Sequence, residues 1–203
     1  GLGSVLLWLA VALTVGITAA YRAHSRRLSE PIINLRLFRD RRFATANLLN
    51  LTAHATMFVS WLLLPALLVN EIGLSTLQGG VVLAASPAAM ALVSPLAGRW
   101  SDRSRPERPV IAGLATEMMG LWLLASLDEQ SSAIAAGLAM ATIGLGLGLF
   151  AGPNMTLVMS ALPTERQGVA SGLALLTRIA GIIVGVAGSR ALFDELESDR
   201  GFV

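Results

Sequence analysis

The stretch GRWSDRSRPERP, residues 98–109, places four Arg and two acidic residues between two long apolar runs. The run before it ends at Ala97, and the next begins at Val110. A run of ~20 apolar residues is long enough to cross a hydrocarbon core of ~30 Å as a helix. Basic residues are in excess in the cytoplasmic loops of membrane proteins. The stretch is therefore predicted to be a cytoplasmic turn between two membrane-spanning helices.

The composition of the whole chain favours a membrane protein over a soluble one. Of 203 residues, 54% are hydrophobic and only 14% are charged, whereas about a quarter are charged in a soluble domain. The chain has no Cys, which excludes disulfides, thiolate metal ligands and Cys nucleophiles. Its basic residues are all Arg and lie mainly between apolar runs. This distribution indicates membrane topology and argues against a nucleic-acid partner.

Six apolar runs are predicted to span the membrane, which gives an all-α integral membrane fold with about six transmembrane helices. The runs are residues 2–21, 43–70, 72–97, 110–127, 131–162 and 167–193. The fifth run is expected to bend or break near Gly152 and Pro153. Between the first and second runs, residues 32–38 suggest a short amphipathic piece on the membrane surface, which Pro31 would start.

The charges between these runs divide the chain into four parts. They are a transmembrane helix at 1–21, a cytoplasmic Arg-rich linker at 22–43, a five-helix bundle portion at 44–193, and an extracytoplasmic acidic tail at 194–203. With the 98–109 turn inside the cell, twelve Arg lie on the cytoplasmic side, and only Arg190 and Arg200 lie outside. We therefore expect a multi-pass protein of the cell membrane, the inner or plasma membrane of a bacterium. Because the chain begins with Gly1 rather than Met, we also expect it to be a piece of a longer protein.

Small residues recur at intervals of four in the last two runs. Such spacing places them on one face of a helix, where they allow two backbones to approach closely in lipid. The sets are Gly144, Gly148 and Gly152, then Gly181, Gly185 and Ser189, and finally Gly168 and Gly172. These faces either serve packing alone or slide against each other during a transport cycle.

Three stretches resemble the major facilitator superfamily. Residues 98–109 resemble its cytoplasmic signature loop, in which Gly98, Asp102, Arg103 and Arg108 match, whereas Arg105 stands where the family has Gly. Residues 144–187 look like the late helices of the fourteen-span drug:proton antiporter branch, and PIINLRLFRDRRF, residues 31–43, is similar to the linker before the second bundle in that branch.

The resemblance implies a partial major-facilitator-type helical bundle. The second to sixth runs would be the first five helices of a C-terminal six-helix bundle, and the first run would be an extra helix between the bundles. The N-terminal bundle of the same polypeptide would be missing. The implied function is secondary active transport, with proton-coupled efflux of drugs or other amphipathic small molecules by alternating access. The implied partners are the lipid bilayer, the substrate and protons, with no cofactor.

Two related functions stay open. The protein could be a transport-inactive membrane scaffold of the same fold, or a major facilitator for another class of solute. An enzyme is not expected, because the sequence offers no paired catalytic residues, no nucleophile motif and no metal-ligand pattern.

Ionisable residues inside apolar runs are costly and therefore candidates for function. Arg178 and His54 each lie ~16 Å along their runs at 1.5 Å per residue, which is near the midplane, and Glu117 lies ~10 Å into its run. All three are candidates for proton coupling. The alternatives are an Arg bound to backbone carbonyls, a neutral Glu at the bundle exterior, and a hydrogen-bonded packing His.

Candidates for substrate contact are polar or adaptable side chains on helices that line the cavity by resemblance. They are Asn47, Asn50, His54, Asn154 and Met155. In the signature loop we expect a conformational latch formed by Gly98, Asp102, Arg103 and Arg108, with Asp102 near a helix N-terminus or a neighbouring Arg. The alternative is a solvated turn that only sets topology.

Overall fold

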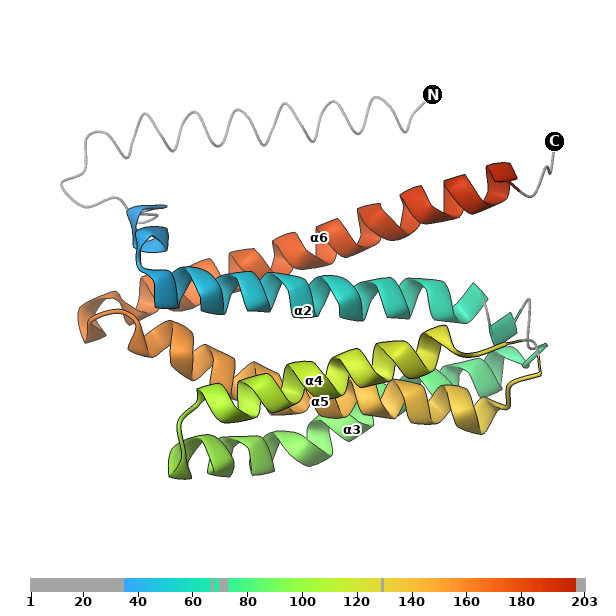
Figure 1. The fold of residues 1–203 in the computed structure, drawn as a ribbon, viewed down its shortest axis with the longest axis horizontal. Coiled ribbons are helices and arrows are strands. Elements are labelled where there is room, and N and C mark those ends of the chain that lie inside the picture. The colour runs from blue at the N-terminus through green and yellow to red at the C-terminus, as the bar shows by residue number, and fades with distance from the viewer. Residues whose placement is uncertain (1–34, 67, 70–72, 129, 200–203) are drawn as a thin grey trace. The chain divides into compact units, whose positions relative to one another are not determined.

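A computed structural model describes residues 35–66, 68, 69, 73–128 and 130–199 of the chain (Figure 1). The predicted first helix, at 2–21, lies outside these residues, as do most of the Arg-rich linker and the end of the acidic tail. The chain divides into two compact units, Gly1–Leu37 and Phe38–Val203. The short helix Leu35–Arg39 begins in the first unit, and all the helices that follow it belong to the second.

The described residues form helices connected by short turns, and no strand occurs among them. In chain order the helices are η1 (Leu35–Arg39), α2 (Arg41–Ala66), α3 (Thr76–Arg103), α4 (Glu107–Ala125), α5 (Ala133–Ser160), η3 (Thr164–Arg166) and α6 (Gln167–Asp199). Helices α2 to α6 occupy the places of the five apolar runs predicted from residue 43 onward. Among them α3, α5 and the stretch Thr164–Arg190 are long and apolar enough to cross a membrane. The predicted all-α partial bundle is thus confirmed.

Local sequence sets where these helices begin. At α2, the Asp40 carboxylate accepts hydrogen bonds from the backbone N–H groups of Arg42 (2.8 Å) and Phe43 (3.1 Å). At α3, Ser75 and Gln78 form a reciprocal capping box, and at α5 the Ser132 hydroxyl accepts from a backbone N–H. Caps of this kind satisfy N–H groups that have no partner within the helix.

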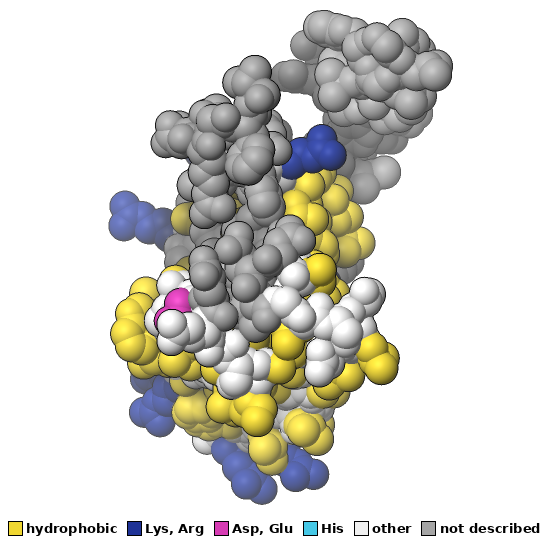
Figure 2. All heavy atoms as spheres, turned by 90° about the vertical axis from the view of Figure 1, so that its right-hand side faces the viewer, with side chains coloured by type: hydrophobic (Ala, Val, Ile, Leu, Met, Phe, Trp, Pro, Cys, Tyr) yellow, Lys and Arg dark blue, Asp and Glu magenta, His cyan; other side chains and the backbone are white. Residues whose placement is uncertain are grey.

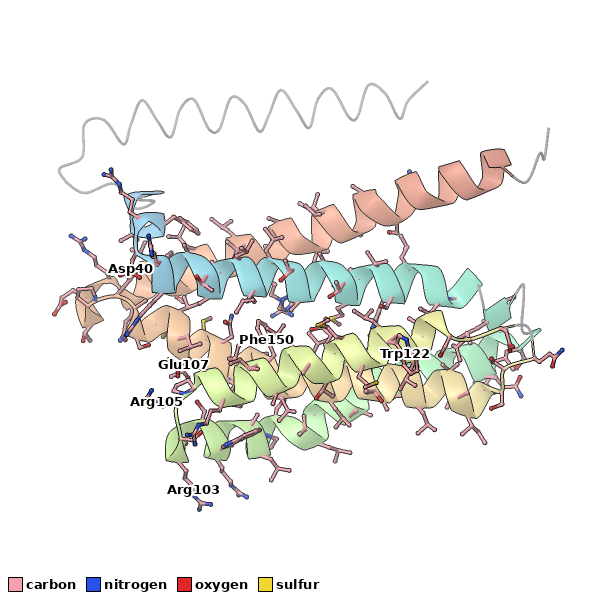
Figure 3. The ribbon with its side chains drawn as sticks, viewed as in Figure 1. Asp40, Arg103, Arg105, Glu107, Trp122 and Phe150 are labelled. Carbon is pink, nitrogen blue, oxygen red and sulfur yellow. The ribbon has the colours of Figure 1, made fainter. Side chains whose placement is uncertain are left out.

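The charged turn is shorter than the sequence suggested. Helix α3 continues past Ala97 to Arg103, and α4 begins at Glu107, so that only residues 104–106 lie between the two helices. Arg103 in the last turn of α3 and Glu107 in the first turn of α4 each have the charge that the helix dipole favours there. Arg103, Arg105 and Glu107 lie at the same end of the bundle as Asp40 (Figure 3).

Helix α5 is the central element of the bundle. It packs extensively against α3 and α4 and also contacts α2 and α6, which pair with each other (Figure 1). Its buried side chains form much of the hydrophobic core and include Met140, Ile143, Leu147 and Phe150. Pro153 lies inside α5, which continues to Ser160, so of the bend or break expected near this residue the break does not occur. Membrane helices tolerate Pro because neighbouring groups can satisfy the freed carbonyl.

Glycines of α5 allow its close contacts with two other helices. A Cβ added at Gly144 or Gly148 would collide with the backbone of α3, whereas one added at Gly146 would lie 2.7 Å from the carbonyl oxygen of Gly113 in α4. Since successive helical residues turn by ~100°, Gly144 and Gly146 lie on nearly opposite faces of α5. The sequence GLGLG therefore serves two interfaces at once.

The other predicted glycine faces are only partly packed. In α6, Gly181 and Gly185 lie directly against the backbone of Leu51 and Ala55 in α2. In contrast, an added Cβ at Gly152, Gly168 or Gly172 would meet no atom of the described residues within 4 Å, so the predicted contacts of these three are not formed within the described bundle. For Gly152 the reason is that α3 and α5 diverge beyond Gly148 (Figure 1).

The outer surface of the helices is rich in large apolar side chains. Leu77, Leu92 and Ile134 are each more than 70% exposed. In the end-on view of Figure 2, hydrophobic side chains cover much of the visible flanks of the described helices. Soluble proteins rarely expose so much apolar surface, and such a surface is suited to contact with lipid or with further helices.

Candidate functional site

A cavity of about 130 Å³ lies among α2, α3, α5 and α6. It brings together most of the polar residues that the sequence singled out within the membrane. The predicted residues that line it are Asn50, His54, Asn154, Met155 and Arg178. Met90, Ala151, Val158, Ala174 and Leu175 complete the lining. Two predicted residues, Asn47 and Glu117, are not part of it.

Asn154 joins α5 to α2 at this cavity. Its side chain is 2% exposed, and its Nδ2 donates to the carbonyl oxygen of Ala46 at 3.1 Å. Its Oδ1 is buried and has no hydrogen-bond partner among the described residues. The orientation of the amide is fixed, because a flipped amide would place its oxygen against the Ala46 carbonyl oxygen.

Asn50 and His54 lie one turn apart on α2. Asn50 Nδ2 donates to the Ala174 carbonyl oxygen (2.8 Å) and to Thr177 Oγ1 (3.3 Å) on α6. His54 is buried, and its Nδ1 lies 2.8 Å from the Asn50 carbonyl oxygen. Because that oxygen can only accept, Nδ1 carries the proton in the neutral ring and Nε2 is left as an acceptor.

Arg178, Met155 and Leu175 contribute the exposed part of the lining. Arg178 lies near the middle of α6 and is exposed, as is Met155 on α5 at 37%. Arg178 is the only charged residue among the described ones that line the cavity. The guanidinium group is a hydrogen-bond donor with a permanent positive charge. The cavity therefore has one cationic donor and no carboxylate on its described walls.

Asn47 lies behind the cavity, between α2 and α6. It is 1% exposed, its Nδ2 donates to the Phe43 carbonyl oxygen, and its Oδ1 accepts from Thr177 Oγ1 at 3.0 Å. Both halves of its amide are therefore occupied. This pairing indicates a structural role in holding α2 against α6.

Glu117 lies on α4, away from the cavity, and is 2% exposed. Its Oε1 accepts a hydrogen bond of 2.7 Å from the hydroxyl group of Thr56 on α2. The same hydroxyl lies 3.0 Å from the Ala53 carbonyl oxygen. Glu117 thus forms a polar link between two helices rather than a part of the cavity wall.

Sequence reasoning missed Thr56 and Thr177, the two hydroxyl partners that hold these polar side chains. Thr is common in membrane helices, where its hydroxyl usually bonds to a carbonyl of its own helix, as Thr56 and Thr177 also do. The signal available in the sequence was closeness to a candidate residue. Thr56 lies two residues after His54, and Thr177 lies immediately before Arg178. Only the helix packing identifies their partners.

The predicted latch residues lie at the α3–α4 turn. Gly98, Asp102 and Arg103 belong to the last turns of α3, whereas Arg108 is in the first turn of α4. Asp102 is exposed, and α4 has no side-chain cap, so Asp102 does not bind the N-terminus of that helix. A latch through Asp102 would need a partner other than that helix end, and this role stays a prediction.

Sequence comparisons agree with the helical bundle. The family model of the Major Facilitator Superfamily matches residues 1–186. The multidrug resistance protein Stp of Mycobacterium tuberculosis is 34% identical over 90% of this chain and 33% of its own length. The drug efflux pump JefA of the same species is 30% identical over 90% of this chain and 34% of its own length. The riboflavin transporter RibZ of Clostridioides difficile is 26% identical over 91% of this chain and 40% of its own length. The chain thus spans about a third of the length of Stp and JefA.

Proposed function

Since this chain belongs to the Major Facilitator Superfamily, we propose that it forms most of one helical bundle of a proton-coupled exporter of amphipathic small molecules. The observation that carries the proposal is the cavity among α2, α3, α5 and α6, which gathers polar side chains inside an otherwise apolar helical bundle. Polar groups inside a membrane protein commonly mark the path of a substrate or an ion. Two relatives that cover 90% of the chain are named as a multidrug resistance protein and a drug efflux pump.

In this proposal the chain supplies one wall of a central binding site. The other wall belongs to an N-terminal bundle of the same polypeptide, and rocking of the two bundles gives alternating access. The relatives' greater length supports this arrangement, because about two thirds of Stp lies outside the matched region. The 203 residues by themselves are accordingly expected to give no flux in reconstituted vesicles.

Three side chains are proposed for proton coupling. His54 and Arg178 share the cavity, whereas Glu117 is linked to α2 through Thr56. A protonated carboxyl or imidazole group can release its proton to one side of the membrane after a conformational change. Arg178 has a different role, because its positive charge would stabilise the deprotonated form of a neighbouring acid.

We expect the end of the bundle that carries the α3–α4 turn to face the cytoplasm. Described Arg residues gather at this end, in the first turn of α2 and around the turn itself, and basic residues are retained on the cytoplasmic side. The chain contains no Cys, so single Cys residues can report sidedness once any Cys elsewhere in the intact protein is replaced. A membrane-impermeant maleimide added to intact cells should label Gln130→Cys but not Arg105→Cys. Labelling of the latter would reverse the orientation.

Transport itself is tested with the intact gene product in bacterial cells. Cells that express it should accumulate less of a lipophilic fluorescent compound than cells with an empty vector. A protonophore should abolish the difference, because export depends on the proton gradient. If expression at a normal level changes accumulation of no compound in a broad panel, the transport-inactive scaffold becomes the better description.

A second candidate is a facilitator for another solute class. One relative, at 26% identity, is named as a riboflavin transporter, so the family members similar to this chain are not confined to drug exporters. Growth of a riboflavin-requiring strain at limiting riboflavin distinguishes the two candidates. Rescue by the intact protein would favour uptake of this solute over drug efflux.

A further inference from the structure

The polar side chains of the cavity share a pattern. Asn50, His54 and Asn154 each use a donor group on a backbone carbonyl oxygen: that of Ala174, of Asn50 and of Ala46, respectively. The bonds to Ala174 and Ala46 join different helices. Each donor is thus engaged in holding the bundle together or in orienting a ring.

The acceptor half of each of these side chains is left without a partner. Asn154 Oδ1 is buried and unpartnered. No hydrogen bond to Asn50 Oδ1 or to His54 Nε2 is formed within the described part of the chain. A buried acceptor without a partner is costly, and a bound donor would offset this cost at Asn154 Oδ1. Asn50 Oδ1 and His54 Nε2 are further acceptors on cavity residues that could bind a donor.

Arg178 supplies the complementary group on the same cavity. It is exposed and has no acidic residue beside it among the described lining residues. A guanidinium group binds carboxylates and other planar acceptors well, often with two parallel hydrogen bonds. It also repels a cation that enters the same small space.

From these features we infer that the substrate has an N–H or O–H donor close to an anionic or strongly accepting group, such as a carboxylate. The donor meets the acceptors of Asn154 and His54, and the accepting group meets Arg178. A quaternary cation is disfavoured at this wall, because Arg178 repels it. This inference rests on the proposed function. It narrows the substrate class from amphipathic molecules in general to acids and zwitterions.

The size of the cavity defines which part of such a molecule it takes. About 130 Å³ is less than the ~300–1,000 Å³ of a site that encloses a drug-sized ligand. It fits a polar head group rather than a whole molecule. The apolar remainder would lie over Met90, Met155 and Leu175, of which the two Met side chains adapt readily to different shapes.

Two fluorescent probes with the same ring system test this chemistry. Both probes have a sulfonamide N–H, which lies next to a carboxylate in dansylglycine and next to a quaternary ammonium group in dansylcholine. Binding of each is measured by fluorescence titration of the purified intact protein in lipid nanodiscs. Dansylglycine is expected to bind at least about tenfold more tightly, since a hydrogen bond to a charged group contributes about 1.5–3 kcal/mol.

Variants of the intact protein then show whether probe binding depends on the residues of the cavity. Arg178→Gln should weaken dansylglycine by roughly tenfold or more and should not weaken dansylcholine. Arg190→Gln removes the same charge from the same helix outside the cavity and should change neither probe by more than about twofold, because exposed charges contribute little. Asn154→Leu should weaken dansylglycine while Arg178 is intact, and its folding is checked by the thermal stability of the purified variant.

The result that overturns the inference is tighter binding of dansylcholine than of dansylglycine, or binding of dansylglycine that does not change in Arg178→Gln. Export assays keep this result separate from the proposed function. Gradient-driven export of dansylcholine but not dansylglycine would refute the inference and retain the exporter. Arg178-dependent binding of dansylglycine without gradient-driven flux would support the inference and refute the exporter.

Discussion

The contacts of α5 with α3 and α4 differ from the contacts that α2 makes with α5 and α6. On the first side, Gly144 and Gly146 let backbones meet directly, and the interface is filled by side chains such as Ile143 and Phe150. On the second side, Asn and Thr side chains hydrogen-bond across the helices. Around Gly144 and Gly146 the first interface consists of backbone contacts and apolar side chains, whereas polar side chains of the second interface line a cavity.

The difference suggests that the two groups of contacts serve different purposes within one bundle. Small residues in close contact give van der Waals packing that tolerates little displacement. On the α2 side, Gly181 and Gly185 also lie against a neighbouring backbone, and hydrogen-bonded side chains additionally keep polar atoms at the cavity. We therefore expect substitutions at the closely packed glycines to affect folding most, and substitutions of ionisable side chains inside the bundle to affect transport most.

A large effect on folding is expected from Gly146→Ala. An added Cβ would lie 2.5 Å from the backbone nitrogen of Glu117 and 2.7 Å from the carbonyl oxygen of Gly113, neither of which can move without shifting α4. Overpacking of this kind costs about 1–3 kcal/mol or more. The thermal stability and yield of the purified intact protein should both fall.

The matched control is Gly137→Ala in the same helix, where an added Cβ meets nothing within 4 Å. Since Ala has a higher helix propensity than Gly, by about 1 kcal/mol, this variant should be as stable as the parent or more stable. Equal stability of the two variants would remove the distinction between packed and open glycines of α5.

The largest effect on transport with normal folding is expected from Glu117→Gln. The amide oxygen of Gln can still accept the hydrogen bond from Thr56, so α2 and α4 stay linked, but the side chain no longer binds a proton. Coupling between sites is typically worth about 5- to 150-fold, and we expect gradient-driven export to fall by about tenfold. Asp128→Asn, an exposed acid in the α4–α5 turn, is the control and should export normally. Normal export by Glu117→Gln would exclude Glu117 as a proton carrier.

A smaller effect on stability is expected from Thr177→Val. The substitution removes the hydroxyl that donates to Asn47 Oδ1 at 3.0 Å and accepts from Asn50 Nδ2. Interhelical hydrogen bonds in membranes are worth about 0.6 kcal/mol on average, so the loss should be about 1 kcal/mol, visible as a lower melting temperature. Thr142→Val is the control, because that exposed hydroxyl bonds only to a carbonyl of its own helix. Equal melting temperatures for the two variants would show that the polar interface does not stabilise the bundle.

The smallest effect is expected from Asp102→Asn at the end of α3. If Asp102 holds one conformation through an exposed ion pair, the pair is worth about 0.2–1 kcal/mol, which is at most about a fivefold change in transport rate. Protein levels should be normal, because Asp102 is exposed. Glu107→Gln in the neighbouring turn serves as the control. Unchanged transport in Asp102→Asn would leave this turn with a role in topology alone.

Much of the fold could be predicted from the sequence, because it depends on properties of short segments. The length of each apolar run, the charges of residues 98–109 and the capping residues Ser75 and Ser132 specify helices and their approximate ends. The depth of Arg178 and His54 within their runs also marked them as candidates for function, whereas Asn154 was a candidate as a polar residue on a helix that lines the cavity by resemblance. Helix ends in the charged turn were missed because helices continue into water when Arg and Glu suit their dipoles.

Tertiary structure alone decided which face of each helix meets which neighbour. Gly148 and Gly152 have the same residue type and lie on the same face of α5, yet only Gly148 is in contact, because α3 diverges from α5 between them. Likewise, the amide of Asn154 is oriented by the Ala46 carbonyl, 108 residues away in the chain. Apolar periodicity gives the existence of a helix but not its rotation or its crossing point, since lipid and a neighbouring helix are equally apolar surroundings. Those two variables determine which acceptors remain free in the cavity.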